Sequence, residues 1–439
     1  MTDPIQDRFY SPLRLIFLSL CALLLMPSLA IEGSTQSAVV AVQVRDTVTY
    51  AADTTGTDTV AQASPEIGWP QSFIDEVRYQ VSHADFLKSS QVGMLFYDLT
   101  ADSVLYGYGE HQLMRPASVL KTLTASAALS QLGGSYQYQT CLYIKGEVAD
   151  SVLQGDVYIV AGFDPRFGSD DMQAFVQALK DQGIYRIAGQ VYTDVSIKDT
   201  TTLGNGWLWH WANDEIPLTP LLYNGHEGFM QKFYEYLDEE GILHPATFAR
   251  AMLPSGGTRL LVSRTHSIDQ ILMRMLKESD NLYAESLFCQ LGAQDHTPYA
   301  DFTHGQRYIK RFIHDNLRLD PNDYEVTDGC GLSTYDLLSP YLIVRMLRYV
   351  HSNPNLYLHL YPSLPVAGQD GTLRNRMKSG TAFTNVHAKT GSVRRVVTLA
   401  GYCQAANGHE VCFAIFHQNV NSSRQARNFD DHLLQVLTR

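Results

Sequence analysis

The chain has 439 residues, of which 45% are hydrophobic and 18% charged, an ordinary composition for a globular protein of two or three domains. Its formal net charge of −12 at pH 7 argues against a nucleic-acid partner. The 15 histidines are scattered, and no His or Cys group has the spacing of a metal site, so we expect neither a metal nor another cofactor.

The N-terminal residues have the pattern of a secretory signal. Arg8 and Arg14 precede an apolar stretch, Leu15 to Leu25, which a small-x-small cleavage pattern follows. We therefore expect a signal peptide at residues 1–30 and a periplasmic protein. The alternative is an uncleaved anchor that keeps the protein membrane-associated, although the apolar run is short for a span. Residues 31–68 are polar and unpatterned, which predicts a flexible linker.

The first chemical motif stands at the start of a helical pattern. A helix over 71–85 and a hairpin of 92–98 with 103–108 are expected to precede it. Ser118-Val119-Leu120-Lys121 is then a Ser-x-x-Lys, and an apolar-periodic run follows it. Ser118 and Lys121 would lie one turn apart on the same helix face, with the Ser118 backbone N–H at the positive end of the helix.

The middle of the chain does not continue this helical pattern. Residues 146–257 contain alternating stretches such as 155–160, then a helix and another strand, and an aromatic stretch from Trp207 to Trp211. We interpret them as an inserted, strand-rich domain. The main domain would then comprise 69–145 and 258–439.

The second motif lies between two predicted helices. Ile268, Ile271, Leu272 and Met275 fall on one helical stripe, and helix-like spacing resumes after Ser279-Asp280-Asn281. A loop between two packed helices is a rigid place from which to direct side chains.

The third motif, Lys389-Thr390-Gly391-Ser392, lies in an extended run over 386–393. A second run, Val396 to Cys403, should pair with it, and a C-terminal helix over 423–437 should follow. The predicted fold class is α/β (α+β), with an antiparallel sheet flanked by helices and the strand-rich domain inserted.

A hairpin turn in this last region suggests a disulfide. Asn407-Gly408 is typical of a two-residue hairpin loop, after which Val411 to Phe416 would return. In that register Cys403 faces Cys412 as a non-hydrogen-bonded pair, where Cβ atoms are closest. We therefore expect a cross-strand disulfide, with free packing cysteines as the alternative.

The three motifs in this order are the signature set of penicillin-recognising serine enzymes. Their joint chance occurrence is on the order of one in several hundred or rarer. Ser118 would be the nucleophile and Lys121 its base, with a pKa lowered by burial and by the second cation, Lys389. Ser279 would relay a proton to the leaving nitrogen, and Asn281 would hold the substrate amide.

The remaining motif residues would bind the reacting group. The backbone N–H groups of Ser118 and Ser392 would stabilise the oxyanion. Lys389 and Thr390 would bind the terminal carboxylate of the substrate. Gly391 would let the substrate backbone approach closely.

Three further segments extend the likeness to one family: Asp328-Gly329-Cys330-Gly331-Leu332-Ser333, the segment Leu364 to Leu373, and Gly162-Phe163-Asp164-Pro165. From about Trp69 to its end, the chain resembles the class C low-molecular-mass penicillin-binding proteins. It is most similar to the penicillin-binding protein 4 type of D-Ala-D-Ala carboxypeptidase/endopeptidase.

This resemblance implies a transpeptidase-like serine peptidase that acts on peptidoglycan stem peptides and is inhibited by β-lactam antibiotics. It also suggests that Asp164 binds the free ammonium of a diamino acid in the substrate, with a plain turn former as the alternative. Two departures bear on peptide specificity: Thr334 stands where the family usually has Arg, and Arg166-Phe167 where it more often has Thr-Leu. Asp328 and Asp370, both followed by Gly, are interpreted as turn residues.

Two other functions remain open. A serine β-lactamase shares the three motifs, but no Glu-x-x-Leu-Asn deacylation loop follows the second motif, and the inserted domain does not fit a compact lactamase. A non-catalytic cell-wall-binding or sensor protein would be expected to have damaged motifs, whereas all three are intact here.

Overall fold

The computed structural model describes residues 68–208 and 216–439. The expected signal peptide, all of the expected linker except its last residue, and Trp209 and Trp211 lie outside these ranges. Within them, no helix combines the length and the apolar character that a membrane crossing requires.

A five-stranded antiparallel sheet forms the centre of the main domain, with the order β2-β1-β11-β10-β9. β1, β10 and β11 are buried along almost their whole length because helices cover both faces of the sheet. The strands are β1 (Gln91–Asp98), β2 (Ser103–Tyr108), β9 (His387–Val393), β10 (Val396–Gln404) and β11 (Glu410–Gln418).

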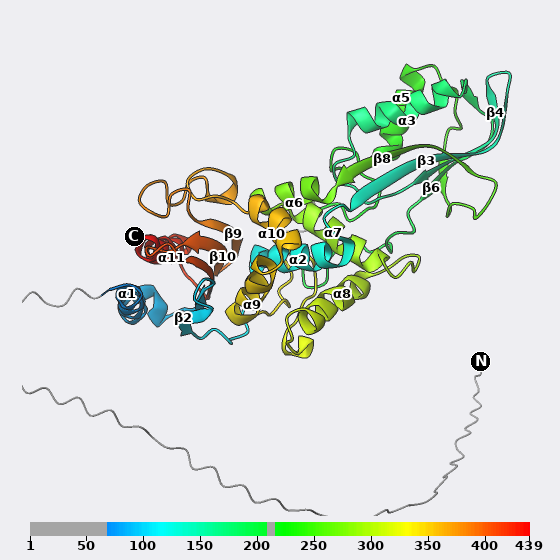
Figure 1. Cartoon of the computed structure of the whole chain (residues 1–439). Helices are drawn as coiled ribbons and strands as arrows, with labels where there is room; N and C mark the ends of the chain where they lie inside the picture. Colours follow the sequence, from blue (N-terminus) through cyan, green and yellow to red (C-terminus); the bar gives the residue numbers. More distant parts are fainter. Residues whose placement is uncertain (1–67, 209–215) are drawn as a thin grey trace, which may run out of the picture. The chain divides into compact units, whose positions relative to one another are not determined.

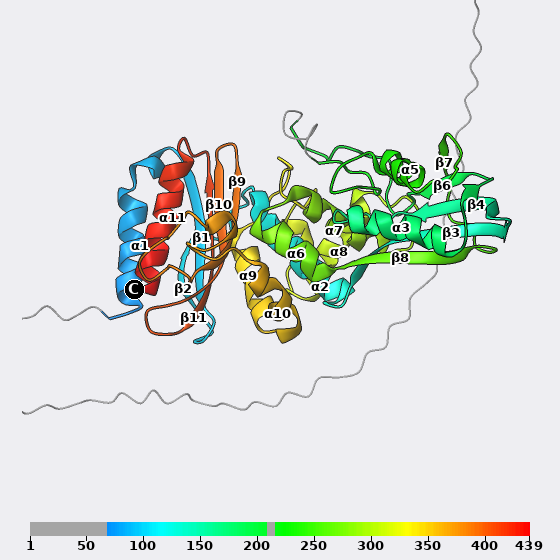
Figure 2. The same ribbon diagram turned by 90° about the horizontal axis from the view of Figure 1, so that it is seen from above.

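Two helices from opposite ends of the described chain cover one face of this sheet. α1 (Gln71–His83) and α11 (Ser423–Thr438) lie side by side against it (Figure 2). Their apolar sides, with Phe73 and Leu433, pack on Phe96 and Phe413 of the sheet. The predicted helices and N-terminal hairpin of this region are thereby confirmed.

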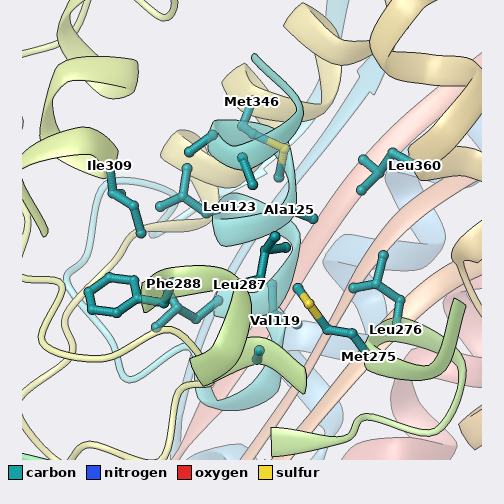
Figure 3. Packing of buried hydrophobic residues seen from close by; sticks show 14 of the residues in the cluster. Val119, Leu123, Ala125, Met275, Leu276, Leu287, Phe288, Ile309, Met346 and Leu360 are labelled. Carbon is teal, nitrogen blue, oxygen red and sulfur yellow. The ribbon is translucent and has the colours of Figure 1, made fainter. Parts of the chain in front are cut away.

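Helices cover the other face, and α2 lies in their midst. The first ten residues of α2 are all buried, so this helix has no solvent side. Figure 3 shows Leu123 and Ala125 of α2 among side chains that include Leu287, Phe288 and Met346. These helices are α2 (Leu120–Leu132), α6 (Ile268–Lys277), α7 (Asn281–Ala293), α8 (Phe302–Asp315), α9 (Pro340–His351) and α10 (Pro354–Ser363). Four 3₁₀ turns lie between the elements of the main domain: η1 (Asp85–Lys88), η2 (Ala117–Val119), η3 (Pro321–Asp323) and η4 (Gly371–Leu373).

A second, mixed sheet forms the inserted, strand-rich unit (Figure 1). α3 (Ser169–Asp181) and α5 (Phe229–Glu239) pack their apolar sides on it. The neighbouring strands β3 and β8 differ from the expected boundaries at 146 and 257, because β3 begins before the first and β8 lies wholly after the second. Residues 133–136 connect α2 to β3, and β8 continues directly into α6. The strands are β3 (Gln137–Ala149), β4 (Val152–Val160), β5 (Arg186–Ile187), β6 (Val191–Asp194), β7 (Phe248–Arg250) and β8 (Arg259–Ser267).

The predicted disulfide between Cys403 and Cys412 is wrong. The β10–β11 loop has three residues instead of two: Ala405 N–H donates to the His409 carbonyl, and Gly408 follows in the left-handed region at φ 84°. The register therefore shifts by one, and Cys403 pairs with Val411. A shift of one residue places the two thiols on opposite faces of the sheet, where each packs in a different core as a free cysteine.

Candidate active site

Ser118 lies in the 3₁₀ turn η2, which leads directly into α2. Ala117 before it has a φ of 45°, a strained backbone conformation for a residue with a side chain. Gly331 presses against this turn, because a Cβ on it would lie 2.0 Å from the Ala117 carbonyl oxygen. Tertiary packing thus fixes the backbone that carries the Ser118 hydroxyl.

Lys121 connects the first two motifs. Its Nζ lies 3.0 Å from Ser118 Oγ, 2.7 Å from Asn281 Oδ1 and 2.8 Å from the Cys330 carbonyl oxygen. The side chain is fully buried, and this burial lowers the pKa of the ammonium although nearby acidic groups oppose the effect. A lowered pKa favours the uncharged amine, the form that can accept a proton.

Lys389 connects the second and third motifs. Its Nζ donates to Ser279 Oγ at 2.8 Å and to the Thr390 carbonyl at 2.6 Å. Burial, and to a lesser extent the nearby Lys121, hold the pKa of Lys389 well below its usual value. The structure therefore places two buried lysines close together, each next to the hydroxyl of a motif serine.

The loop of the second motif is held rigidly at the start of α7. Ser279 has a φ of 62°, in the left-handed region. Asp280 caps α7 by accepting from the backbone N–H groups of Leu282 and Tyr283 at 3.1 and 3.4 Å. Arg274 Nε also donates to the Asp280 carboxylate, at 2.9 Å. These contacts orient Ser279 on one side of Asp280 and Asn281 on the other.

β9 presents the third motif on the edge of the sheet. The segment around Pro365 covers only the start of this edge, where its carbonyl accepts from Ala388 N–H at 2.9 Å. Among the described residues, no strand pairs with the edge beyond that point. Thr390 Oγ1 bonds to Thr372 Oγ1 at 2.7 Å, and Ser392 is exposed, 3.4 Å from an Arg427 nitrogen. The edge is therefore suited to pair with an extended peptide.

The fold itself requires a glycine at position 391. A Cβ on Gly391 would lie 2.1 Å from Thr398 Oγ1, 2.9 Å from the Pro116 carbonyl oxygen and 3.0 Å from the Ser118 backbone nitrogen. The close approach that requires glycine is thus between β9 and the turn that carries Ser118, within the protein itself. The expectation that Gly391 also makes room for the substrate backbone stays a prediction.

The loop after Asp328 supplies a contact that sequence patterns did not reveal. The Asp328 carboxylate accepts from the backbone N–H groups of Cys330, Gly331 and Ser333, and from Trp207 Nε1. Asp328 is therefore a turn residue, as expected, and Trp207 packs against this loop. The loop in turn directs the Cys330 carbonyl to Lys121. A backbone carbonyl leaves no residue-type signal, which is why only the structure identifies it.

The structure does not support Asp164 as a direct substrate ligand. Its side chain is buried, and its two oxygens accept from Arg166 N–H at 2.9 Å and from His266 Nδ1 at 2.5 Å. The hydrogen bond to Asp164 raises the pKa of His266, so the pair tends toward an internal ion pair. The turn around Asp164 packs on α7, where Gln290 and Ser286 donate to the carbonyls just before it. Asp164 is thus a turn former with an internal partner.

Thr334 and Asp370, two loop residues singled out in the sequence, both make hydrogen bonds within the protein. Thr334 donates through both its N–H and its hydroxyl to the Gly206 carbonyl, at 3.1 and 3.2 Å. Asp370 accepts from Lys277 Nζ at 2.7 Å and from the Val366 N–H at 2.8 Å, as a turn residue should.

One group in the described part of the chain offers three possible metal ligands. Atoms of Glu285, Asp328 and Cys330 lie within 4.8 Å of one another, all buried. The Asp328 carboxylate already accepts hydrogen bonds from four N–H groups, and the amine of Lys121 lies beside these three residues. The three residues are therefore poorly suited to bind a cation. The absence of a metal and of other cofactors stays a prediction.

The fold and the motif geometry together define a penicillin-recognising serine peptidase. The chain matches the D-Ala-D-Ala carboxypeptidase 3 (S13) family over residues 77–216 and 216–439, and it belongs to this family. It is therefore a serine-type D-Ala-D-Ala carboxypeptidase, and the β-lactamase alternative is the weaker one.

Characterised relatives agree with this assignment. The D-alanyl-D-alanine carboxypeptidase DacB of Haemophilus influenzae is 24% identical, over 75% of this chain and 85% of the relative. The D-alanyl-D-alanine carboxypeptidase of Actinomadura sp. strain R39 is 23% identical, over 75% of this chain and 78% of the relative.

Solved structures show the same fold. Penicillin binding protein 4 of Haemophilus influenzae has a TM-score of 0.75 at 22% identity, covering 81% of this chain and 99% of that one. A predatory endopeptidase of Bdellovibrio bacteriovorus, acylated by penicillin G and bound to its immunity protein, has a TM-score of 0.50 at 18% identity, covering 79% and 93%.

Proposed function

We propose that this enzyme cleaves the terminal D-Ala-D-Ala bond of peptidoglycan stem peptides through an acyl-enzyme on Ser118, and that β-lactams acylate the same serine. The observation that carries the proposal is the 3.0 Å contact between the Ser118 hydroxyl and the fully buried amine of Lys121. The penicillin-acylated Bdellovibrio neighbour and the carboxypeptidase relatives support it.

Acylation begins with proton transfer from Ser118 to Lys121. A serine hydroxyl is a poor nucleophile near neutral pH, and the uncharged form of Lys121 is the base within reach. Burial favours this uncharged form of Lys121. Ser118 Oγ then attacks the carbonyl carbon of the penultimate D-Ala, and the carbonyl oxygen takes the negative charge.

That charge is stabilised by backbone donors. The N–H of Ser118 at the start of the helix and the N–H of Ser392 on β9 form the oxyanion hole in this proposal. Gly391 supports the arrangement because its missing side chain lets β9 approach the Ser118 nitrogen.

Departure of D-Ala requires a proton on its nitrogen. Ser279 gives its proton to that nitrogen and regains one from Lys389, to which it is hydrogen-bonded at 2.8 Å. Asn281 holds the substrate amide through its side-chain amide nitrogen, because its Oδ1 already accepts from Lys121. Lys389 and Thr390 bind the terminal carboxylate of the substrate, whose negative charge favours the protonated form of Lys389 and makes its hydrogen bond charge-assisted.

Hydrolysis completes the cycle. Before this step, exchange with solvent water removes from Lys121 the proton that it took from Ser118 and restores a proton to Lys389. A water molecule then attacks the ester carbonyl and gives a proton to Lys121. Lys121 passes this proton to Ser118 Oγ as the ester bond breaks.

We also propose that the protein acts outside the cytoplasmic membrane, in the periplasm. The basic, apolar and small-residue pattern of residues 1–30 supports this location. N-terminal sequencing of protein from a periplasmic fraction tests it, and a mature chain that starts near residue 31 is expected.

Two assays test the function. Purified protein should bind a fluorescent penicillin covalently, and Ser118→Ala should not; equal labelling of the two would refute the assignment of the nucleophile. Incubation with defined muropeptides, monomeric and cross-linked, followed by chromatography, then shows whether the released group is D-Ala alone or a whole stem peptide. The first product indicates a carboxypeptidase and the second an endopeptidase.

A further inference from the structure

A group of acidic side chains lies buried close to Lys121. Glu285, Asp328 and Asp336 are each fully buried, and so is the Cys330 thiol. Ionised carboxylates are rarely buried without partners, so their hydrogen bonds show which of them carries the charge.

Asp328 has the partners of a carboxylate anion. Its two oxygens accept four N–H donors at 2.6 to 3.1 Å, three from the backbone and one from Trp207. A proton on either oxygen would weaken that oxygen as an acceptor and would compete for space with the two N–H donors that face it. The negative charge of this group therefore lies on Asp328.

Glu285 has the partners of a neutral carboxylic acid. One oxygen accepts from the Gly329 N–H at 2.9 Å, and the other has no hydrogen-bond partner among the described residues. Its oxygen and one of Asp328 lie within 4.8 Å of each other, a separation at which two buried carboxylates do not both ionise. Burial first, and Asp328 second, raise the pKa of Glu285 to about 8.

Glu285 is also joined to Lys121 through the protein. Glu285 lies one turn after Asn281 on α7, and the side chain of Asn281 accepts from Lys121. On the other side, Glu285 holds the Gly329 N–H, and the next residue, Cys330, offers its carbonyl to the same lysine. Glu285 thus touches both the helix and the loop that provide the acceptors of Lys121.

We propose that Glu285 is a positioning residue for the Lys121 base: its neutral carboxyl fixes the Gly329–Cys330 peptide against Lys121 without adding a second negative charge. This inference rests on the proposed function, since it requires Lys121 to act as the base. Ionisation of Glu285 would stabilise the protonated form of Lys121, and the amine could then no longer take the proton of Ser118.

Several titratable groups face Glu285, and its ionisation must be interpreted with all of them. Lys121 on α2 and the nearby Cys330 thiol favour the ionised form of Glu285, whereas Asp328 disfavours it, and Asp336 and Cys289 lie within electrostatic range. These groups are Lys121, Asp328, Cys330, Asp336 and Cys289.

The test is the pH dependence of penicillin acylation. In the wild type, the second-order rate constant should fall as the pH rises through about 8. Glu285→Gln keeps an oxygen for the Gly329 N–H but cannot ionise, so its falling limb should move up by at least one pH unit. Asp336→Asn is the matched control, because it removes another buried carboxyl group of the same region. That carboxyl group accepts from the Thr327 N–H and has no bond to a residue that contacts Lys121. Its profile should follow the wild type.

A falling limb at the same pH in Glu285→Gln and wild type would overturn the inference. If Glu285→Gln does not fold, an infrared titration of the wild type replaces it. The wild type should show two bands of protonated carboxyl groups at pH 7, one from Glu285 and one from Asp336. The Glu285 band should disappear near pH 8, and it should still be present at pH 7 in Asp336→Asn. Absence of that band also overturns the inference. Penicillin labelling of the wild type and of Ser118→Ala tests the proposed function separately. A wild type that is never acylated would refute the proposed function, whereas the pH profiles test only the role of Glu285.

Discussion

The motif cluster of Ser118, Lys121, Ser279, Asn281 and Lys389 and the Asp164 turn each contain a buried charged group, but the partners of these groups differ. Lys121 is surrounded by neutral acceptors, a hydroxyl, an amide and a carbonyl, and burial lowers its pKa. Asp164 is bound to His266 and raises the pKa of that imidazole.

This difference separates a reactive group from a structural one. A buried charge whose partners do not neutralise it has an altered proton affinity, which is useful for catalysis. A buried charge with a complementary partner has its affinity satisfied internally and offers little to a ligand. Motif resemblance alone did not distinguish the two cases.

The largest expected effect comes from removing the nucleophile or its base. Ser118→Ala and Lys121→Ala should each lower peptide hydrolysis and penicillin acylation by several orders of magnitude, because the two residues act as a unit. Their combination should be little worse than either alone. An additive double variant, measured by single-turnover kinetics, would show that Lys121 does not act on Ser118.

The second motif provides a smaller test within the cluster. Ser279→Ala should reduce peptide hydrolysis by about 10²–10⁴-fold, the usual contribution of a positioned proton donor. Binding of the substrate should change much less, because Lys389 and Thr390 remain. Separate measurement of kcat and KM checks this, and a rise in KM at constant kcat would speak for a binding role of Ser279 instead.

Asp164→Asn tests the structural side of the comparison. It should destabilise the protein by roughly 1–3 kcal/mol, the cost of leaving a buried partner unsatisfied, and should slow peptide and penicillin reactions by similar factors. The pKa of His266 is raised in the folded state, so its stabilisation is fully present below about 6.5 and lost as the pH rises through the raised value. The loss of melting temperature should therefore be larger at pH 5.5 than at pH 9. A selective loss of peptides with a free amine would instead restore the substrate role of Asp164.

The last of these expected effects is the pH dependence of stability at Glu285. The folded state binds its proton up to a pH of about 8, against about 4.5 when exposed, so its burial disfavours folding increasingly as the pH rises between these values. Each pKa unit corresponds to about 1.4 kcal/mol at most. Glu285→Gln should therefore gain melting temperature relative to the wild type at pH 8 compared with pH 5. An unchanged difference between the two pH values would contradict a neutral Glu285.

Local pattern sufficed for much of the fold. The helix at 71–83, the hairpin of β1 and β2, and the C-terminal helix follow from hydrophobic periodicity, because each buries one side against a neighbouring layer. The register of the last hairpin did not follow, since one additional loop residue, Ala406, moves every pair and separates Cys403 from Cys412. Loop length is a single-residue matter, and Asn-Gly is compatible with loops of two or three residues.

The sequence by itself determined the chemical class of this protein, because two hydroxyls, two amines and an amide are recognisable as residue types in three ordered motifs. Only the tertiary structure decided how these groups work: that Lys121 and Lys389 are fully buried, that a carbonyl of Cys330 completes the site, and that Asp164 has an internal partner. Burial and hydrogen bonding depend on which segments pack together in space. Burial and hydrogen bonding set the pKa of a side chain and decide which of its polar atoms remain available to a ligand. Neither property follows from the position of the residue in the chain.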